Sequence, residues 1–139
     1  MIDVKTLYSE EYMWNGMFMR ISEYEPMITA FGNVVFMVED NAYQGDTRVL
    51  YDNDGKIGHL IFGWGSCTGC DALQGCKSIE EVQELCNELE NDIMWFDTRE
   101  EALKYFETHD WEGDWSWYHD ETHTYVELAI KYLKGETNA

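Results

Sequence analysis

The sequence predicts a single α+β domain in which a small antiparallel sheet packs against helices near the C-terminus. Three observations lead to this fold class. A chain of 139 residues is the usual size of one domain, and its 45% hydrophobic and 15% aromatic residues supply a core. An Asp-Gly pair lies between two apolar runs, and three segments of helical periodicity follow it. We therefore treat residues 1–139 as one domain.

The apolar runs define the predicted sheet. Thr47–Asp52 and Lys56–Trp64 flank Asn53-Asp54-Gly55, and glycine readily takes the positive φ of a tight turn, so these runs predict a β-hairpin. Asn33–Asp40 holds five consecutive apolar residues and predicts a buried strand. Ile93–Phe96 is a candidate for a further short strand.

Capping signatures mark the predicted helices. Ser78-Ile79-Glu80-Glu81 and Thr98-Arg99-Glu100-Glu101 both match the capping box, which predicts helices from residue 79 and from residue 99 to about residue 108. A third helix is expected from Tyr118 or Asp120 to Lys134, with Gly135 as its stop. Nearer the N-terminus, residues 4–14 predict a short helix, and residues 21–30 are ambiguous around the single proline.

The chain carries 28 acidic and 9 basic residues, a formal net charge of −19. This charge argues against direct binding to nucleic acid, because phosphate recognition needs clustered Lys and Arg. No apolar run approaches the roughly 18 residues of a membrane span, and the start lacks the pattern of a signal peptide. We therefore expect a cytoplasmic protein, in which cysteines are more often thiolates than disulfides.

The negative charge is concentrated in the second half of the chain. Residues 1–70 hold ten acids and four bases, a net −6, whereas residues 71–139 hold eighteen acids and five bases, a net −13. Large aromatic residues interleave with these acids, which favours a folded acidic surface over a disordered tail. Such a surface attracts basic clefts built for nucleic acid, although it also serves simply to keep a domain soluble. The expected partner-binding residues are Glu80, Glu81, Glu84, Glu88, Asp92, Glu100, Glu101 and Glu107.

All four cysteines lie within twenty residues, at Cys67, Cys70, Cys76 and Cys86. Zinc takes four such ligands in a closed structural site, so we expect these cysteines to hold a structural Zn²⁺. Three alternatives stay open: Cys86 as a core residue, Cys67 and Cys70 as a redox pair, or an iron–sulfur cluster. His59 is a possible ligand in place of Cys86, although a lone strand histidine more often packs in the core.

A histidine pair suggests a rival function from another class. His119 and His123 stand four residues apart, as in the zinc-protease pattern His-Glu-x-x-His, and Glu127 is a possible third ligand. Asp120 replaces the glutamate that would act as general base, which puts catalysis in doubt. The alternative without a metal is an exposed helix N-terminus. There, acidic residues stabilise the helix by interacting with the positive end of its dipole. A metal-dependent hydrolase is thus the alternative hypothesis.

The segment Gly63-Trp64-Gly65-Ser66-Cys67-Thr68-Gly69-Cys70-Asp71-Ala72-Leu73-Gln74-Gly75-Cys76 is similar to a motif of small phage and prophage proteins. With its size and acidity, the chain resembles the phage-encoded anti-CRISPR proteins that inhibit the type II effector nuclease, including a zinc-containing member. Anti-CRISPR proteins share no common fold, so the fourteen residues identify a class and not a set of functional residues. The resemblance implies a stoichiometric, non-enzymatic inhibitor that binds the RNA-guided nuclease of the bacterial host and blocks loading of target DNA. An acidic phage protein of other role is the remaining alternative.

Overall fold

The structure is a computed structural model that describes residues 2–8, 13–14, 17–18, 24–40, 45–65, 71–76, 78–111 and 120–136. It confirms the α+β class, with four α-helices and a four-stranded antiparallel sheet within these ranges. The elements follow in the order η1 (Val4–Thr6), β1 (Met13–Trp14), β2 (Met17–Phe18), α1 (Glu25–Phe31), β3 (Val34–Glu39), β4 (Gly45–Asn53), β5 (Lys56–Trp64), α2 (Ile79–Asp92), β6 (Met94–Phe96), α3 (Arg99–Thr108) and α4 (Asp120–Leu133).

The strands of the main sheet lie in the order β3-β4-β5-β6, and β1 pairs only with β2. The predicted hairpin joins β4 to β5, with Asn53 opposite Lys56. Its two turn residues, Asp54 and Gly55, have φ angles of 54° and 95°, which is the positive-φ pair that a two-residue hairpin turn requires. The Gly55 amide donates to the Asp52 side chain at 2.7 Å and holds the turn in place.

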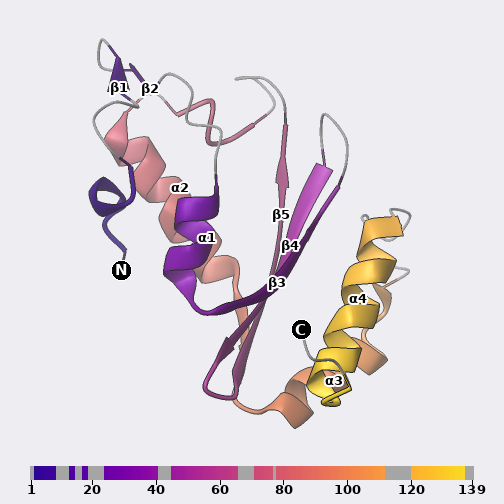
Figure 1. Ribbon diagram of the computed structural model, residues 1–139. Helices are drawn as coiled ribbons and strands as arrows, with labels where there is room; N and C mark the ends of the chain where they lie inside the picture. The colour runs from indigo at the N-terminus through magenta and orange to yellow at the C-terminus, as the bar shows by residue number, and fades with distance from the viewer. Residues whose placement is uncertain are drawn as a thin grey trace.

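The sheet separates two helical layers, with α1 and α2 on one face and α3 and α4 on the other (Figure 1). Side chains alternate along the central strands, so Val49 and Tyr51 of β4 face α1 and α2, whereas Leu50 between them faces α3 and α4. Each face thus has its own apolar cluster, and β4 is buried along most of its length. The prediction of a sheet covered by C-terminal helices is therefore correct for one face, while α1 shares the other with α2.

Both edge strands of the sheet are irregular or short. In β3 the register with β4 shifts between Val34 and Phe36, and this bulge places Val35 and Phe36 together on the α3–α4 side. At the opposite edge β6 has only three residues. Bulges and short strands are the features that natural sheets use against edge-to-edge pairing.

The predicted capping boxes are formed. The Ser78 hydroxyl accepts the Glu81 amide at 3.2 Å, and the Thr98 hydroxyl accepts the Glu101 amide at 3.1 Å. Helix α4 ends where Gly135 takes a φ of 76° and its amide donates to the Tyr132 carbonyl at 2.9 Å. Local sequence signals therefore determine where these helices begin and end.

The N-terminal helix prediction is wrong in part. Residues 4–6 form only a 3-10 turn, and β1 falls in the remainder of the predicted helix. The cause is a tertiary contact, since Gln83 of α2 accepts the Val4 amide at 3.1 Å and donates to the Ile2 carbonyl at 2.6 Å. From Glu25 onward the ambiguous segment is helical and belongs to α1, with its proline in the first turn, where a missing N–H breaks no helical bond. Within the described ranges, no helix combines the length and apolarity needed to cross a bilayer.

Candidate binding surface and cysteine cluster

The predicted partner-binding carboxylates are all exposed, but they do not form one helix face. Five of them lie on α2 and three lie on α3, and the sheet stands between these helices. The set on α2 is Glu80, Glu81, Glu84, Glu88 and Asp92, and the set on α3 is Glu100, Glu101 and Glu107. The structure therefore defines two acidic surfaces, which we call the α2 surface and the α3 surface.

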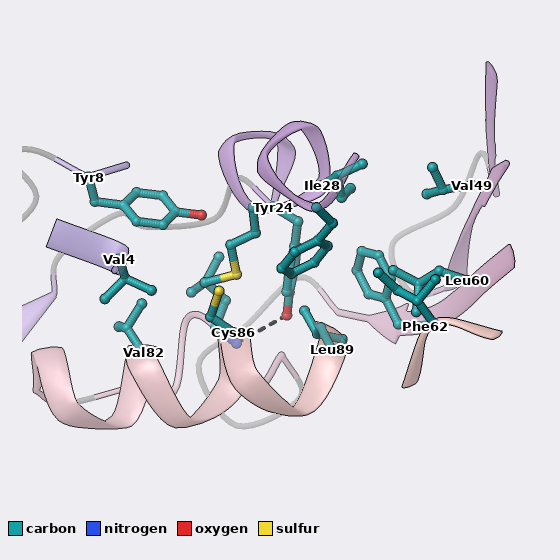
Figure 2. Close-up of a cluster of buried hydrophobic side chains, with 14 of the residues drawn as sticks. Val4, Tyr8, Tyr24, Ile28, Val49, Leu60, Phe62, Val82, Cys86 and Leu89 are labelled. Carbon is teal, nitrogen blue, oxygen red and sulfur yellow. Dashed lines mark hydrogen bonds between the residues drawn. The ribbon is translucent and has the colours of Figure 1, made fainter. Parts of the chain in front are cut away.

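The α2 surface carries no compensating charge on its own helix. The helix contains six acidic residues and no Lys or Arg, because its sequence alternates apolar and acidic positions at helical spacing. Val82, Cys86 and Leu89 are buried against the sheet and α1, so the carboxylates are left on the opposite side. Figure 2 shows Cys86 and Leu89 pointing from α2 toward α1, and Val82 pointing toward Val4 of η1.

Basic groups partly neutralise the α3 surface. Arg99 and Lys104 lie on the same helix, and Lys134 at the end of α4 forms an ion pair with Glu107 at 3.6 Å. Arg99 also donates to Asp52 at 2.9 Å and lies over the ring of Tyr132 at 4.9 Å. Helix α3 thus has three acids and two bases, a net −1, against −6 for α2.

Of the predicted zinc ligands, Cys76 and Cys86 lie within the described ranges, and both are buried in the α1–α2 apolar cluster. Cys67 and Cys70 fall outside the described residues. Burial raises the pKa of each described thiol to about 11, and nearby carboxylates add to the effect. The Cys76 thiol donates to the Ala72 carbonyl at 3.3 Å. Without a metal these two side chains are therefore neutral thiols that pack in a core.

The buried carboxylate of Asp71, which the sequence analysis did not single out, holds together the segment that leads to Cys76. Asp71 is 3% exposed, and its side chain accepts hydrogen bonds from the Tyr24 hydroxyl, the Leu73 amide and the Gln74 side chain. Gln74 also donates to the Gly65 carbonyl at 3.0 Å. It thereby ties together the two residues that flank positions 66–70. The position of this aspartate directly after a Cys-x-x-Cys sequence was the signal that could have identified it.

Burial and hydrogen bonding also affect Tyr24, which comes just before α1. Its hydroxyl accepts the Leu73 amide at 3.1 Å, drawn as the dashed line in Figure 2, while donating to Asp71. Burial and the hydrogen bond to Asp71 raise the pKa of Tyr24 far above its usual range. The hydroxyl is thus a fixed neutral donor that joins α1 to the segment 71–76.

His59 lies on the other side of the sheet from Cys76 and Cys86. It packs among the aromatic side chains of α3 and α4, and its Nδ1 atom is 2.6 Å from the Tyr125 hydroxyl. This placement removes His59 as a substitute ligand for Cys86 and supports the packing interpretation. Across the part of the chain that the structure describes, no three His, Cys, Asp or Glu side chains are grouped to hold a metal ion.

The rival metal site is described only in part. His123 and Glu127 are exposed on α4, whereas His119 lies outside the described residues. The metal-dependent hydrolase therefore stays an alternative hypothesis.

The sequence analysis also missed a buried ionic cluster beneath α4. Arg48 of β4 is fully buried, pairs with Asp40 at 2.9 Å and approaches Asp46 at 3.8 Å. Its Nε donates to the Thr122 hydroxyl at 3.0 Å. An arginine directly before the apolar run Val49-Leu50-Tyr51 of a predicted strand was the signal for this cluster.

A shallow cavity of about 590 Å³ lies at the hairpin end of the sheet, apart from both cysteines and the α2 surface. Asp52, Arg99 and Tyr132 line it and already bond to one another. The predicted sites therefore do not coincide with this hollow.

Comparison with known proteins yields no relative: no family model matches the chain, and no curated protein or solved structure is similar to it.

Proposed function

We propose that this chain is a non-enzymatic binding protein that presents the α2 surface to a basic, nucleic-acid-binding groove of a partner protein. The observation that carries the proposal is the charge of α2, which has six acids and no base. Charge complementarity of this kind steers association and excludes wrong partners.

The spacing of the carboxylates along α2 is close to the spacing of phosphates along a nucleic-acid strand, which supports this proposal. Fourteen residues at about 1.5 Å each give a helix about 21 Å long, so six carboxylates average one per about 3.5 Å. One strand of duplex DNA carries one phosphate per about 3.4 Å of axis. The helix therefore matches the linear charge of a single nucleic-acid strand and has about half that of a duplex.

The α2 surface is also held in a fixed shape. Ser78 caps the helix, its apolar face is buried, and Gln83 ties it to the N-terminal segment through two backbone hydrogen bonds. A preorganised array loses less conformational entropy when it binds than a flexible acidic tail does. A rigid α2 surface is therefore better able to compete with a nucleic-acid strand for the basic groove of the partner protein.

The resemblance to phage-encoded anti-CRISPR proteins names the partner within this proposal. The partner is the type II RNA-guided nuclease of the bacterial host, and the chain prevents target DNA from loading. The three carboxylates of the α3 surface contribute less, because bases on α3 and α4 offset their charge.

A structural zinc ion bound by Cys67, Cys70, Cys76 and Cys86 remains part of the proposal. Cys76 and Cys86 share one buried cluster, which agrees with a closed site. Because burial keeps both as neutral thiols, binding would release their protons, and zinc affinity would fall as pH falls. The ion would stabilise the fold and would not contact the partner.

The experiment compares two double charge reversals in a pull-down with the purified nuclease–guide complex. Glu84→Lys with Glu88→Lys alters the α2 surface, and Glu100→Lys with Glu107→Lys makes the same change in net charge on α3. We expect the α2 variant to lose at least about tenfold in affinity and the α3 variant to lose less than about threefold. Binding of the native chain should weaken from 50 to 300 mM NaCl and should be displaced by target DNA.

Equal losses for both variants would show that only net charge matters, and binding that target DNA does not displace would reject the competition. Circular dichroism of both variants checks that the fold is intact. If the native chain does not bind the nuclease at any salt concentration, this partner is wrong.

A further inference from the structure

His59 is the one buried histidine among the three that the structure describes, at 7% exposure, whereas His109 is half-buried and His123 is exposed. It projects from the middle of β5 into the α3–α4 layer. Its ring stacks on Tyr125 at 5.4 Å and meets the rings of Phe106 at 5.1 Å and Trp111 at 5.8 Å. The imidazole is thus enclosed mainly by aromatic groups.

One hydrogen bond fixes the orientation of this ring. The Tyr125 hydroxyl donates its single proton to the Val49 carbonyl at 2.9 Å, so its oxygen accepts from His59 Nδ1 at 2.6 Å. The neutral ring therefore carries its proton on Nδ1. A second proton would place a full charge inside an apolar layer.

The described parts of the neighbouring elements offer that charge no counterion. Among the described residues, the titratable or charged groups facing His59 are Tyr105 on α3, His109 directly after α3, Tyr125 on α4 and, beyond Tyr125, the cation Arg48 on β4. The residues opposite His59 in the sheet, Leu50 and Met94, are apolar. No carboxylate among the described residues acts on the ring, and His109 acts as a repelling charge.

We propose that His59 is an acid-sensitive latch, whose protonation releases the α3–α4 layer from the sheet while the α1–α2 layer stays packed. The selectivity follows from the architecture, because the two apolar clusters lie on opposite faces of the sheet. Among the described residues, the rings that contact His59 lie in the cluster that contains Phe106, Trp111 and Tyr125.

The direction of the pH effect follows from the pKa. Burial, with repulsion from His109, lowers the pKa of His59 from 6.5 to about 3. A group whose pKa is depressed in the folded state stabilises that state fully above its unfolded pKa and loses this effect as pH falls. The latch is therefore closed above about pH 6.5 and weakens progressively toward pH 3. At pH 4.5 the opening equilibrium should rise roughly 100-fold over that at neutral pH.

Hydrogen exchange read by mass spectrometry at pH 7.5 and 4.5, corrected for intrinsic rates, tests this proposal. In the native chain, peptides from α3 and α4 should lose roughly 100-fold in protection at pH 4.5, whereas peptides from α1 and α2 should not. His59→Gln, which keeps a donor but cannot gain a proton, should abolish the difference. His123→Gln on the exposed side of α4 is the matched control and should behave like the native chain.

An unchanged acid response in His59→Gln, or equal loss of protection in both layers, would overturn the latch. NMR titration of the histidine rings in the native chain provides a test that does not depend on the variant folding. His59 should remain neutral in the folded state down to about pH 4. Titration of His59 near pH 6.5 in the folded chain would also overturn the proposal.

Discussion

Arg48 and Asp40 form an ion pair at 2.9 Å in which both side chains are almost completely buried. The pair joins the segment after β3 to the centre of the sheet, and a hydrogen bond from Arg48 to Thr122 extends it to α4. Asp40 also accepts the Asp46 amide at 2.8 Å. Three separate parts of the chain therefore depend on one guanidinium group.

Replacing Arg48 should be among the most damaging single substitutions in the sheet. Arg48→Ala leaves the carboxylates of Asp40 and Asp46 buried without their cation, which should lower the free energy of unfolding by about 3–5 kcal/mol. Urea denaturation measures the loss. Arg99→Ala is the matched control, because Arg99 pairs with Asp52 at the same 2.9 Å but is 45% exposed. It should cost about 0–1 kcal/mol, and equal losses would contradict the role given to burial.

The hydroxyl of Tyr24 should contribute more to stability than that of Tyr51. Tyr24 donates to the carboxylate of Asp71, whereas Tyr51 donates to the neutral Ile28 carbonyl at 2.8 Å, and both rings are buried. Hydrogen bonds to charged groups contribute about 1.5–3 kcal/mol and neutral ones about 0.5–1.5 kcal/mol. We therefore expect Tyr24→Phe to lower the free energy of unfolding by more than Tyr51→Phe does. Urea titration of both variants decides this, and a reversed order would contradict the carboxylate's role.

The parts of the fold that could be predicted from the sequence depend on local interactions. Asp54-Gly55 adopts the hairpin turn, and Ser78 and Thr98 cap their helices, because each signal acts within four residues. Exposure of the α2 carboxylates could be predicted in the same way from helical spacing. The structure of residues 4–6 resisted prediction because Gln83, which accepts the Val4 amide, lies 79 positions away along the chain.

The site features that were missed depend on contacts between distant residues. The division of the acids into two surfaces follows from α2 and α3 packing on opposite faces of the sheet, which helical periodicity does not specify. The partners of Asp71 and His59, Tyr24 and Tyr125, lie 47 and 66 positions away along the chain. Composition identifies such buried polar residues as unusual but does not identify their partners.

Cys76 and Cys86 should react slowly with alkylating agents in the folded chain when no zinc is bound. Their pKa values of about 11 leave roughly one thiolate in a thousand at pH 8, and both side chains are buried. Iodoacetamide labelling followed by peptide mass spectrometry should show rates at least about 100-fold below those in urea. Labelling of either residue at the unfolded rate would contradict the burial.

The zinc prediction leads to a test of metal content. Elemental analysis of freshly purified protein should find one zinc per chain, and Cys70→Ser should lose the metal and lower the melting temperature. Cys86→Val keeps an apolar side chain in the core but removes a ligand, so it should also lose zinc. Retention of zinc by Cys86→Val would make Cys86 a packing residue, and a metal-free native chain would remove the zinc site altogether.

The α2 surface should reduce the stability of the chain that carries it. Glu80, Glu84 and Glu88 stand four residues apart, so like charges meet twice along the helix. Glu84→Lys converts both contacts into attractive pairs, which should raise the free energy of unfolding by about 1 kcal/mol at low salt. Glu100→Lys should have the opposite sign, because Lys104 then faces a second lysine four residues away.

Thermal melts at 20 mM and 1 M NaCl measure both effects, and the difference between the variants should shrink at high salt as charges are screened. Destabilisation by Glu84→Lys at low salt would show that basic groups elsewhere in the chain already balance the α2 carboxylates. Suppose that Glu84→Lys stabilises the fold, Glu100→Lys destabilises it, and the α2 double variant binds the nuclease more weakly. The α2 carboxylates then lower the stability of the fold and strengthen its association with the partner. Solubility alone would not require such a row on one helix, because the same acids interspersed with bases would also keep a domain soluble.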